Sequence, residues 1–227
     1  NAVHSPLQGA DRYMAKFAHI EDIHRRIFAA MLANMDDSVG KVMQKLKDLS
    51  LQKNTLVFFF ADNGGPTREL TSSNAPLRGE KGQAYEGGLR VPFLMSWPNV
   101  IPASMTYSKP VSTLDLFPTA CAAAGAKLPK KKMDGVNILP FLTRKTHKEP
   151  HQYLFWRIGD RHALRKGEWK ILRYRNKPWS LFNLKNDKEE TSNLANQMPS
   201  KVEELIKVWE SENAGMIAPI WTAKRKK

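Results

Sequence analysis

An acid and an amide that directly follow an apolar run are the first residues in this chain whose types and spacing could do chemistry. The run LVFFFA spans residues 56–61, and Asp62-Asn63-Gly64-Gly65 comes next. In open α/β sheets, ligands bind outside the carboxyl ends of the strands, where these residues would lie. Asp, Asn and Gly are also common turn residues, so a simple turn is the competing interpretation.

A lysine among glycines is the second candidate. Lys81 stands in the segment RGEKGQAYEGG, which lacks the G-x-x-x-x-G-K-[ST] spacing of a P-loop. Flanking glycines would let this lysine approach an anion closely. Arg78 and Arg90 could also touch an anion, but we expect them to form ion pairs with Glu80 or Glu86.

Two other features are not predicted to be sites. Asp36 and Asp37 are neighbours on a predicted helix, where adjacent side chains point about 100° apart, so a solvated or helix-pairing role is favoured over a shared ion. The single cysteine, Cys121, excludes an internal disulfide.

The elements that would position these residues begin with a helix and a strand. Apolar residues recur at helical spacing over residues 21–50, which predicts a long amphipathic helix. The run at 56–61 shows no alternation, so we expect a strand covered on both faces, as in a mostly parallel sheet. Residues 64–90 are rich in Gly and predict a long loop.

A second strand and a second helix follow that loop. Residues 91–97 predict the strand, and STLDLFPTACAAAGA predicts the helix. Ser112 or Thr113 can cap the helix, Asp115 suits its first turn, and Gly125 suits its end.

The composition changes around residues 143–150, which predict a charged linker. Beyond it, YLFWRIG, HALRKGEWKILRY and WSLFNL predict a small antiparallel sheet, and residues 199–212 predict a helix that lies on it. We therefore expect two domains, residues 1–148 and residues 149–227.

The composition is that of a basic globular chain. Its 227 residues carry a net charge of +14, with 13 Lys and Arg against 10 Asp and Glu up to residue 113, and 23 against 12 after it. Such charge attracts polyanions, and the tail at 224–227 is one of its dense points. No apolar run approaches the ~18 residues that a membrane span needs.

Several stretches together resemble the sulfatase family of the alkaline-phosphatase superfamily. They include NAVHSPLQ, NTLVFFFADNGG, PLRGEKGQAYEGGLRVPFLMSWP, PVSTLDLFPTACAAAGA and LRKGEWKILRY, in the family's order. The resemblance implies the C-terminal part of an alkaline-phosphatase-like mixed sheet with flanking helices, followed by a small subdomain of antiparallel sheet and helix.

One family motif is missing. Sulfatases carry C/S-x-P-x-R, whose Cys or Ser becomes the formylglycine nucleophile, and Cys121 is followed by Ala-Ala-Ala-Gly instead. The chain also opens on Asn1 without an initiator Met. We therefore expect it to be the C-terminal portion of a sulfatase, inactive by itself, and to need the missing N-terminal portion or self-association to cover its sheet.

The resemblance also implies roles for individual residues. Asp62 and Asn63 would bind a divalent cation, Ca²⁺ or alternatively Mg²⁺, for which oxygen ligands are suited. Lys81 would hold a sulfate oxygen and stabilise charge in the transition state. His4 would contact the sulfate and help to protonate the leaving alcohol.

The function implied is hydrolysis of a sulfate ester, of a sulfated glycan or an aryl sulfate. A phosphodiesterase or phosphonate hydrolase of the same superfamily is one alternative, and a non-catalytic module that binds polyanions is another. We expect no nucleic-acid partner. By the resemblance alone, the protein would be periplasmic, secreted or lysosomal.

Overall fold

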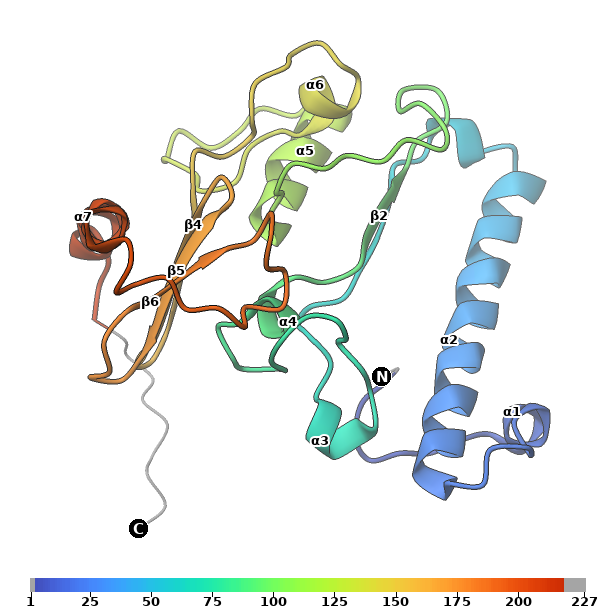
Figure 1. The fold of residues 1–227 in the computed structure, drawn as a ribbon. Coiled ribbons are helices and arrows are strands. Elements are labelled where there is room, and N and C mark those ends of the chain that lie inside the picture. The colour runs from blue at the N-terminus through green and yellow to red at the C-terminus, as the bar shows by residue number, and fades with distance from the viewer. Residues whose placement is uncertain (1–2, 219–227) are drawn as a thin grey trace. The chain divides into compact units, whose positions relative to one another are not determined.

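The computed structural model describes residues 3–218, without the side chains of Glu69 and Leu70. The chain folds as two compact units (Figure 1). The first comprises Asn1–Ser73 and Val91–Pro150, and the second comprises Asn74–Arg90 and His151–Lys227. One boundary thus lies close to the predicted one, but the segment 74–90 belongs to the second unit. The division into domains 1–148 and 149–227 stays a prediction.

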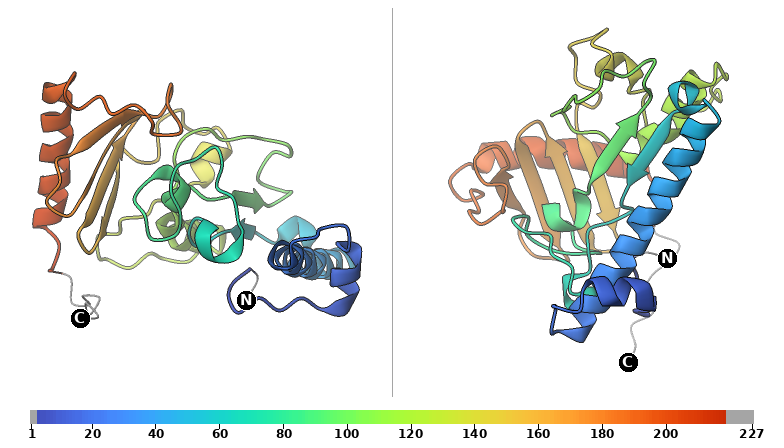
Figure 2. Two further views of the ribbon diagram at one scale, coloured as in Figure 1. Left: turned by 60° about the horizontal axis from the view of Figure 1, so that its bottom comes forward. Right: turned by 90° about the vertical axis from the view of Figure 1, so that its right-hand side faces the viewer.

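In its described residues, the first unit contains helices and one pair of strands (Figure 2). Its elements are α1 (Asp11–Lys16), α2 (Ile23–Asp48), η1 (Gln52–Asn54), β1 (Val57–Phe60), α3 (Thr67–Leu70), β2 (Phe93–Ser96), η2 (Thr113–Asp115), α5 (Leu116–Ala123) and α6 (Leu139–Leu142).

The long helix predicted at residues 21–50 is confirmed as α2. It begins after Asp22, whose carboxylate accepts a hydrogen bond from the Arg25 amide at 2.6 Å. The Tyr13 hydroxyl of α1 donates to Asp37 of α2 at 2.7 Å. The helix-pairing role predicted for Asp37 is therefore confirmed.

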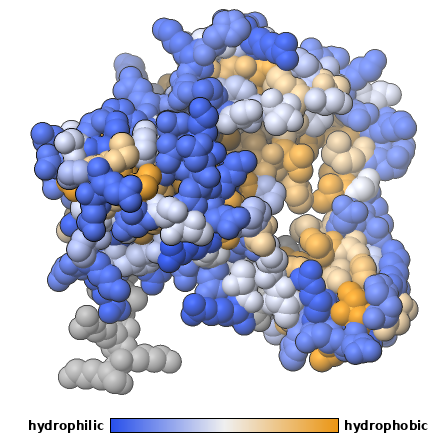
Figure 3. Space-filling model, in the orientation of Figure 1, coloured by the Kyte–Doolittle hydropathy of each residue, from blue (hydrophilic) through white to orange (hydrophobic). Residues whose placement is uncertain are grey.

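The strands β1 and β2 form an antiparallel pair, with Phe58 opposite Met95. On β2, Phe93 and Met95 pack on a core centred on Ile101, Ile138 and Leu142, while the intervening Leu94 remains 61% exposed. Phe59 and Phe60 of β1 are 37% and 36% exposed. Figure 3 shows apolar atoms exposed in the region of β2.

The 56–61 run differs from the expectation in its pairing, and its incomplete coverage agrees with a sheet that needs a further portion to cover it. Its pairing is antiparallel rather than parallel. Its apolar side chains are only partly covered, because the elements described here pack against only some of them. An apolar run without alternation therefore predicted the strand itself, but not the direction of its partner strand or the elements that cover it.

The predicted helix at 112–125 is confirmed as η2 followed by α5. Ser112 caps its start, and the buried Asp115 carboxylate accepts from the amides of Ser112 and Val136 at 2.7 and 2.9 Å. The chain leaves the helix through Gly125 at φ +67°.

The second unit contains a short helix, a four-stranded sheet and a longer helix. Its elements are α4 (Glu86–Leu89), β3 (Leu154–Ile158), β4 (Arg161–Lys166), β5 (Trp169–Tyr174), β6 (Ser180–Asn183) and α7 (Pro199–Ala214). The strands run antiparallel in the order β3-β4-β5-β6, which confirms the predicted small sheet.

Alternate residues of this sheet face two different layers. Leu164 and Ile171 pack against Leu205 and Trp209 of α7, which lies along one face as predicted (Figure 2). On the other face, Leu172 and Phe182 pack with Ala84 and Tyr85. Segment 74–90 therefore covers the face of the sheet that α7 does not.

No helix among residues 3–218 is long and apolar enough to cross a membrane. The basic tail at residues 224–227 lies outside the described residues.

Candidate functional site

Asp62 and Asn63 lie in a bend after β1, at the carboxyl end of the strand, where the sequence placed them. Asp62 is exposed and Asn63 is half-buried. The Asn63 amide nitrogen donates to the Gly64 carbonyl at 3.0 Å. This bond assigns the amide nitrogen as a donor, so the side-chain oxygen is the atom that could face a cation.

The chemistry of these two donors fits a hard divalent cation. A carboxylate oxygen and an amide oxygen are the ligand types that Ca²⁺ and Mg²⁺ prefer, but Ca²⁺ takes about 6 to 8 of them. Within the described residues, no group of three or more His, Cys, Asp or Glu could hold a metal ion. Asp62 and Asn63 would therefore supply only part of a cation site.

His4 belongs to the same unit and is exposed. Its Nδ1 lies 3.0 Å from the Ser5 carbonyl oxygen, to which it can donate a hydrogen bond. Asn1, the first residue of the histidine's sequence motif, lies outside the described residues.

Lys81 belongs to the second unit and is an exposed residue of a tight turn. The Gln83 amide donates to the Glu80 carbonyl at 2.9 Å and closes that turn. Gly79 and Gly82 flank it at φ +91° and +80°, a region in which a side chain would be strained. The glycines therefore set the backbone path that presents the lysine.

The segment around Lys81 is tied to the sheet below it. Arg161 of β4 donates to the carbonyl of Gly82, and the Ala84 amide donates to the Tyr174 hydroxyl of β5 at 2.8 Å. Burial raises the pKa of Tyr174 and keeps its hydroxyl neutral. These bonds fix alternate residues of the segment to neighbouring strands.

The two glycines that follow Glu86 in α4 allow a close approach of backbones. A Cβ at Gly87 would meet the Arg78 carbonyl oxygen at 2.6 Å, and one at Gly88 would collide with the carbonyls of Gln83 and Glu80. The Gly87 amide donates to Arg78 O at 2.7 Å. The start of α4 thus packs directly on the Lys81 turn.

A buried charge cluster anchors the end of the segment. Lys170 of β5 lies 2.8 Å from Glu86 Oε1 and 2.9 Å from Glu190 Oε1. Burial raises the pKa of Glu190, and Lys170 opposes this shift.

The ion pair predicted between Glu86 and Arg78 or Arg90 is wrong. Glu86 pairs with Lys170 and, at 3.4 Å, with Arg165. Arg78 instead lies over the Tyr85 ring and donates to the Glu190 carbonyl at 2.8 Å. The sequence analysis did not identify Lys170 and Glu190 as partners of Glu86. The position of Lys170 between Trp169 and Ile171 in an apolar strand could have indicated a buried, paired lysine.

The four predicted site residues thus divide between the units. His4, Asp62 and Asn63 belong to the first unit, and Lys81 belongs to the second. The structure brings Asp62 and Asn63 together in one bend, and it presents Lys81 on a turn that its own unit holds in place.

Comparisons with known proteins match nearly the whole chain. Residues 1–126 match the family model described as sulfatase, and residues 80–213 match the model of the C-terminal region of N-sulphoglucosamine sulphohydrolase. A protein named sulfatase from Formosa agariphila is 35% identical over 204 residues, covering 77% of this chain and 36% of that protein. Human arylsulfatase A is 42% identical over 131 residues, covering 57% of this chain and 25% of that protein.

A solved structure is similar over almost the full chain. Ps i-CgsB, crystallised in complex with k-i-k-neocarrahexaose, superposes with a TM-score of 0.90 at 35% identity, covering 99% of this chain and 51% of that one. This likeness confirms the predicted α/β fold class. The chain spans about half the length of that structure and a smaller share of the curated relatives that it matches.

Proposed function

Because the chain belongs to the sulfatase family, as its motifs predicted, we propose that the complete protein of which it is a part hydrolyses a sulfate ester. The observation that carries this proposal is the Lys81 turn, a cation presented on backbone that glycines and the sheet hold in place. A cation carried on such a backbone suits a reaction in which negative charge develops on sulfate oxygens.

Each of the four predicted site residues would have its own part in the reaction. Lys81 binds a sulfate oxygen and stabilises the charge that develops on it. His4 contacts the sulfate and delivers a proton to the leaving oxygen. Asp62 and Asn63 contribute two oxygen ligands to a Ca²⁺ or Mg²⁺ ion, which would act as a Lewis acid toward the sulfate when bound.

The nucleophile would come from a segment outside this sequence. No residue of the chain stands in a C/S-x-P-x-R motif, which in this family supplies the formylglycine. Residues 1–227 alone would therefore bind part of the sulfate and part of the cation, but would not turn over substrate.

A sulfated glycan is the substrate class we propose. Ps i-CgsB was crystallised with an oligosaccharide, and N-sulphoglucosamine sulphohydrolase acts on a sugar by its name. The net charge of +14 favours an acidic ligand of this kind. Such a substrate is consistent with a periplasmic, secreted or lysosomal protein.

Replacing Lys81 by Ala in the complete protein tests the proposal. We expect kcat on an aryl sulfate to fall by about 10²- to 10³-fold, because one charge-stabilising donor in a shielded site is worth that much. The matched control is Lys185→Ala, an exposed lysine of the same unit, which should leave kcat unchanged. Near-normal turnover by Lys81→Ala would contradict the proposed role of Lys81.

The same preparations separate the alternatives. A phosphodiesterase or phosphonate hydrolase would turn over an aryl phosphate diester or a phosphonate ester faster than the aryl sulfate. A polyanion-binding module would bind heparin with strong salt dependence and no dependence on Asp62, Asn63 or Lys81. The sulfatase proposal predicts that the aryl sulfate is turned over fastest. It also predicts that activity depends on Asp62, Asn63 and Lys81.

A further inference from the structure

We propose that Glu190 and Lys170 are positioning residues for Lys81, acting through the backbone of Glu86. The inference rests on the proposed role of Lys81 in binding sulfate. It assigns a task in the reaction to a buried charge cluster of the second unit whose members would not touch the substrate.

The cluster is closed to solvent and balanced in charge. The side chains of Lys170 and Glu190 are 0% exposed, and that of Glu86 is 4% exposed. With Arg165 at 3.4 Å from Glu86, two cations face two carboxylates. Removing one partner of such a buried pair is costly because an uncompensated charge remains, so the cluster favours a single arrangement.

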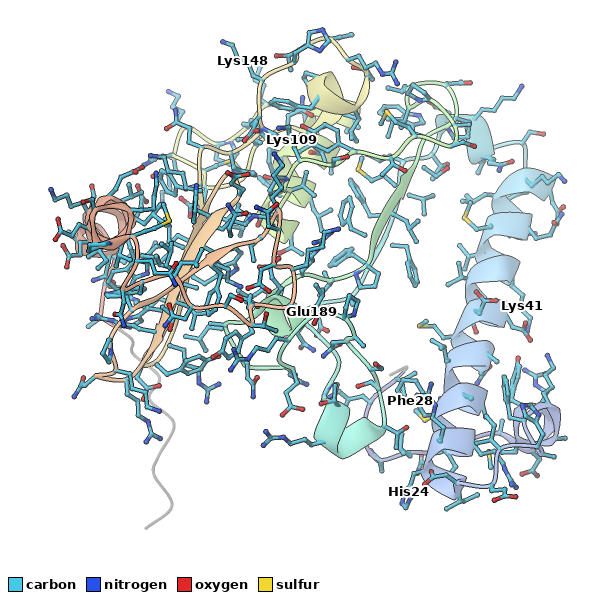
Figure 4. The ribbon with its side chains drawn as sticks, viewed as in Figure 1. His24, Phe28, Lys41, Lys109, Lys148 and Glu189 are labelled. Atoms are coloured by element: carbon cyan, nitrogen blue, oxygen red, sulfur yellow. The ribbon has the colours of Figure 1, made fainter. Side chains whose placement is uncertain are left out.

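Glu190 also holds the backbone of the segment directly. One carboxylate oxygen, Oε1, contacts Lys170, and the other, Oε2, accepts the Glu86 amide at 2.6 Å. Glu189, labelled in Figure 4, marks the turn that carries Glu190 beside α4. A single side chain thus links the ammonium on β5 to the first residue of α4.

The turn that carries Glu190 is itself fixed. Asp187 accepts hydrogen bonds from the amides of Thr191 and Ser192 at 3.0 and 2.9 Å. Desolvation raises the pKa of Asp187, but these two amides, the Thr191 hydroxyl and the Glu190 amide together lower the pKa overall. Arg78 donates to the Glu190 carbonyl from the other end of the segment.

The connection from Glu86 to Lys81 is short and stiff. Gly82, Ala84 and Glu86 are bonded in turn to Arg161, Tyr174 and Glu190. Gly82 and Ala84 are bonded to the sheet, and Glu86 is bonded to the turn that carries Glu190. Loss of the hydrogen bond at the Glu86 amide would therefore loosen the C-terminal end of this bonded segment. A displacement of about 1 Å in a reacting group can cost a large factor in rate.

Two variants of the complete protein that differ by one acceptor test this role. Lys170→Met/Glu190→Ala removes the ion pair and the acceptor for the Glu86 amide. Lys170→Met/Glu190→Gln removes the same charges but restores an acceptor oxygen. Removing both charges together avoids the unpaired ion that would unfold a single variant. Lys166→Met, on the rim of β4 and paired with Glu204, is the surface control.

We expect the Ala variant to lose about tenfold or more in kcat/KM on an aryl sulfate relative to the Gln variant. The Ala variant should also have a lower Tm than the Gln variant, because the buried Glu86 amide loses its acceptor, so both are assayed well below the lower Tm. Lys166→Met should retain wild-type kinetics. Equal kcat/KM for the two variants would overturn the proposal, because it would leave the cluster a purely structural role.

A double-mutant cycle with Lys81→Ala shows whether the effect passes through the lysine. In that background, the Ala and Gln variants should have equal kcat/KM. A difference that persists there would also overturn the positioning role. If Lys81→Ala alone leaves turnover intact, the proposed function fails instead, so the two failures are distinguishable.

Discussion

Asp62 offers an exposed carboxylate at the end of β1, and Asn63 offers a half-buried amide oxygen beside it. We expect Asp62→Ala in the complete protein to abolish tight Ca²⁺ binding, because it removes both a ligand and a negative charge. Asn63→Ala should weaken binding less, since only a neutral ligand is lost. Calorimetric titration measures both affinities.

The control for that titration is Asp36→Ala, which removes an exposed carboxylate from α2. It should leave Ca²⁺ affinity unchanged. An unchanged affinity in Asp62→Ala would return the residues after β1 to their competing interpretation as a simple turn.

Among single residues, the sequence predicted those whose neighbours in the chain mark them out. Asp62 follows an apolar strand, and Lys81 stands among glycines, so both could be singled out by their neighbours in the chain. The partners of Glu86 could not, because Lys170 lies 84 positions away and Glu190 lies 104 positions away. Ion-pair partners were therefore sought among nearby arginines, which was wrong.

Two glycines in different helices should respond to alanine in opposite directions. Gly88→Ala forces a Cβ against the carbonyls of Gln83 and Glu80, so we expect the second unit to lose about 1–3 kcal/mol of unfolding free energy. Gly40 lies within α2, and a Cβ added there would meet no atom within 4 Å apart from the backbone of its own helix. Gly40→Ala should therefore gain about 0.5–1 kcal/mol from helix propensity.

Urea unfolding followed by circular dichroism measures both changes. A Gly88→Ala protein as stable as wild type would show that α4 does not press on the Lys81 turn. A Gly40→Ala protein with reduced stability would show that this face of α2 is covered in solution.

His162 of β4 should make the second unit sensitive to acid. Burial lowers its pKa from 6.5, as does the nearby Arg173, whose Nε donates to His162 Nδ1 at 3.0 Å; Arg157 lowers it further, while Asp160 and a hydrogen bond with the Gly159 backbone oppose them. A lowered pKa means that the unfolded chain binds the proton first. Stability should be fully present above about pH 6.5 and should decline as the pH falls through the folded-state pKa.

Thermal unfolding at pH 7.5 and 5.5, followed by tryptophan fluorescence, tests this expectation. His162 stacks on Trp209 with ring centroids 4.5 Å apart, so His162→Phe keeps an aromatic ring there and removes the titrating group. The variant should lose less Tm than wild type between the two pH values. His24→Phe, at an exposed position of α2 labelled in Figure 4, should behave as wild type.

Helices were predictable from periodicity because their spacing is local, and α2 and α7 lie within a few residues of the predicted bounds. The antiparallel sheet was predictable from short β-type runs separated by turns. The environment of β1 was not, because burial of Phe59 or Leu94 depends on which elements are present to cover them.

The whole chain, produced as residues 1–227, should self-associate. Large apolar side chains are exposed on the first unit, among them Val42 at 61%, Leu94 at 61%, Leu114 at 57% and Phe117 at 53%. Apolar surface in water costs about 25 cal/mol per Å², and the two-stranded pair leaves unpaired edges. Light scattering should report a mass above 25.8 kDa.

The same preparation should show no turnover of an aryl sulfate with added Ca²⁺. A monodisperse monomer would show that the exposed apolar surface is tolerated in water. Turnover of substrate would show that residues 1–227 contain a nucleophile after all.

Segment 74–90 belongs to the second unit, but the rest of that unit begins only after Pro150, 60 residues further along the chain. On a ribosome, Glu86 therefore emerges long before its partner Lys170, which is 84 positions further along. At a synthesis rate of about 5–20 residues per second, the wait is roughly 4 to 17 s. During that interval Ala84 and Tyr85 have no sheet to cover, so the Lys81 turn gains its fixed backbone only after β5 has been made.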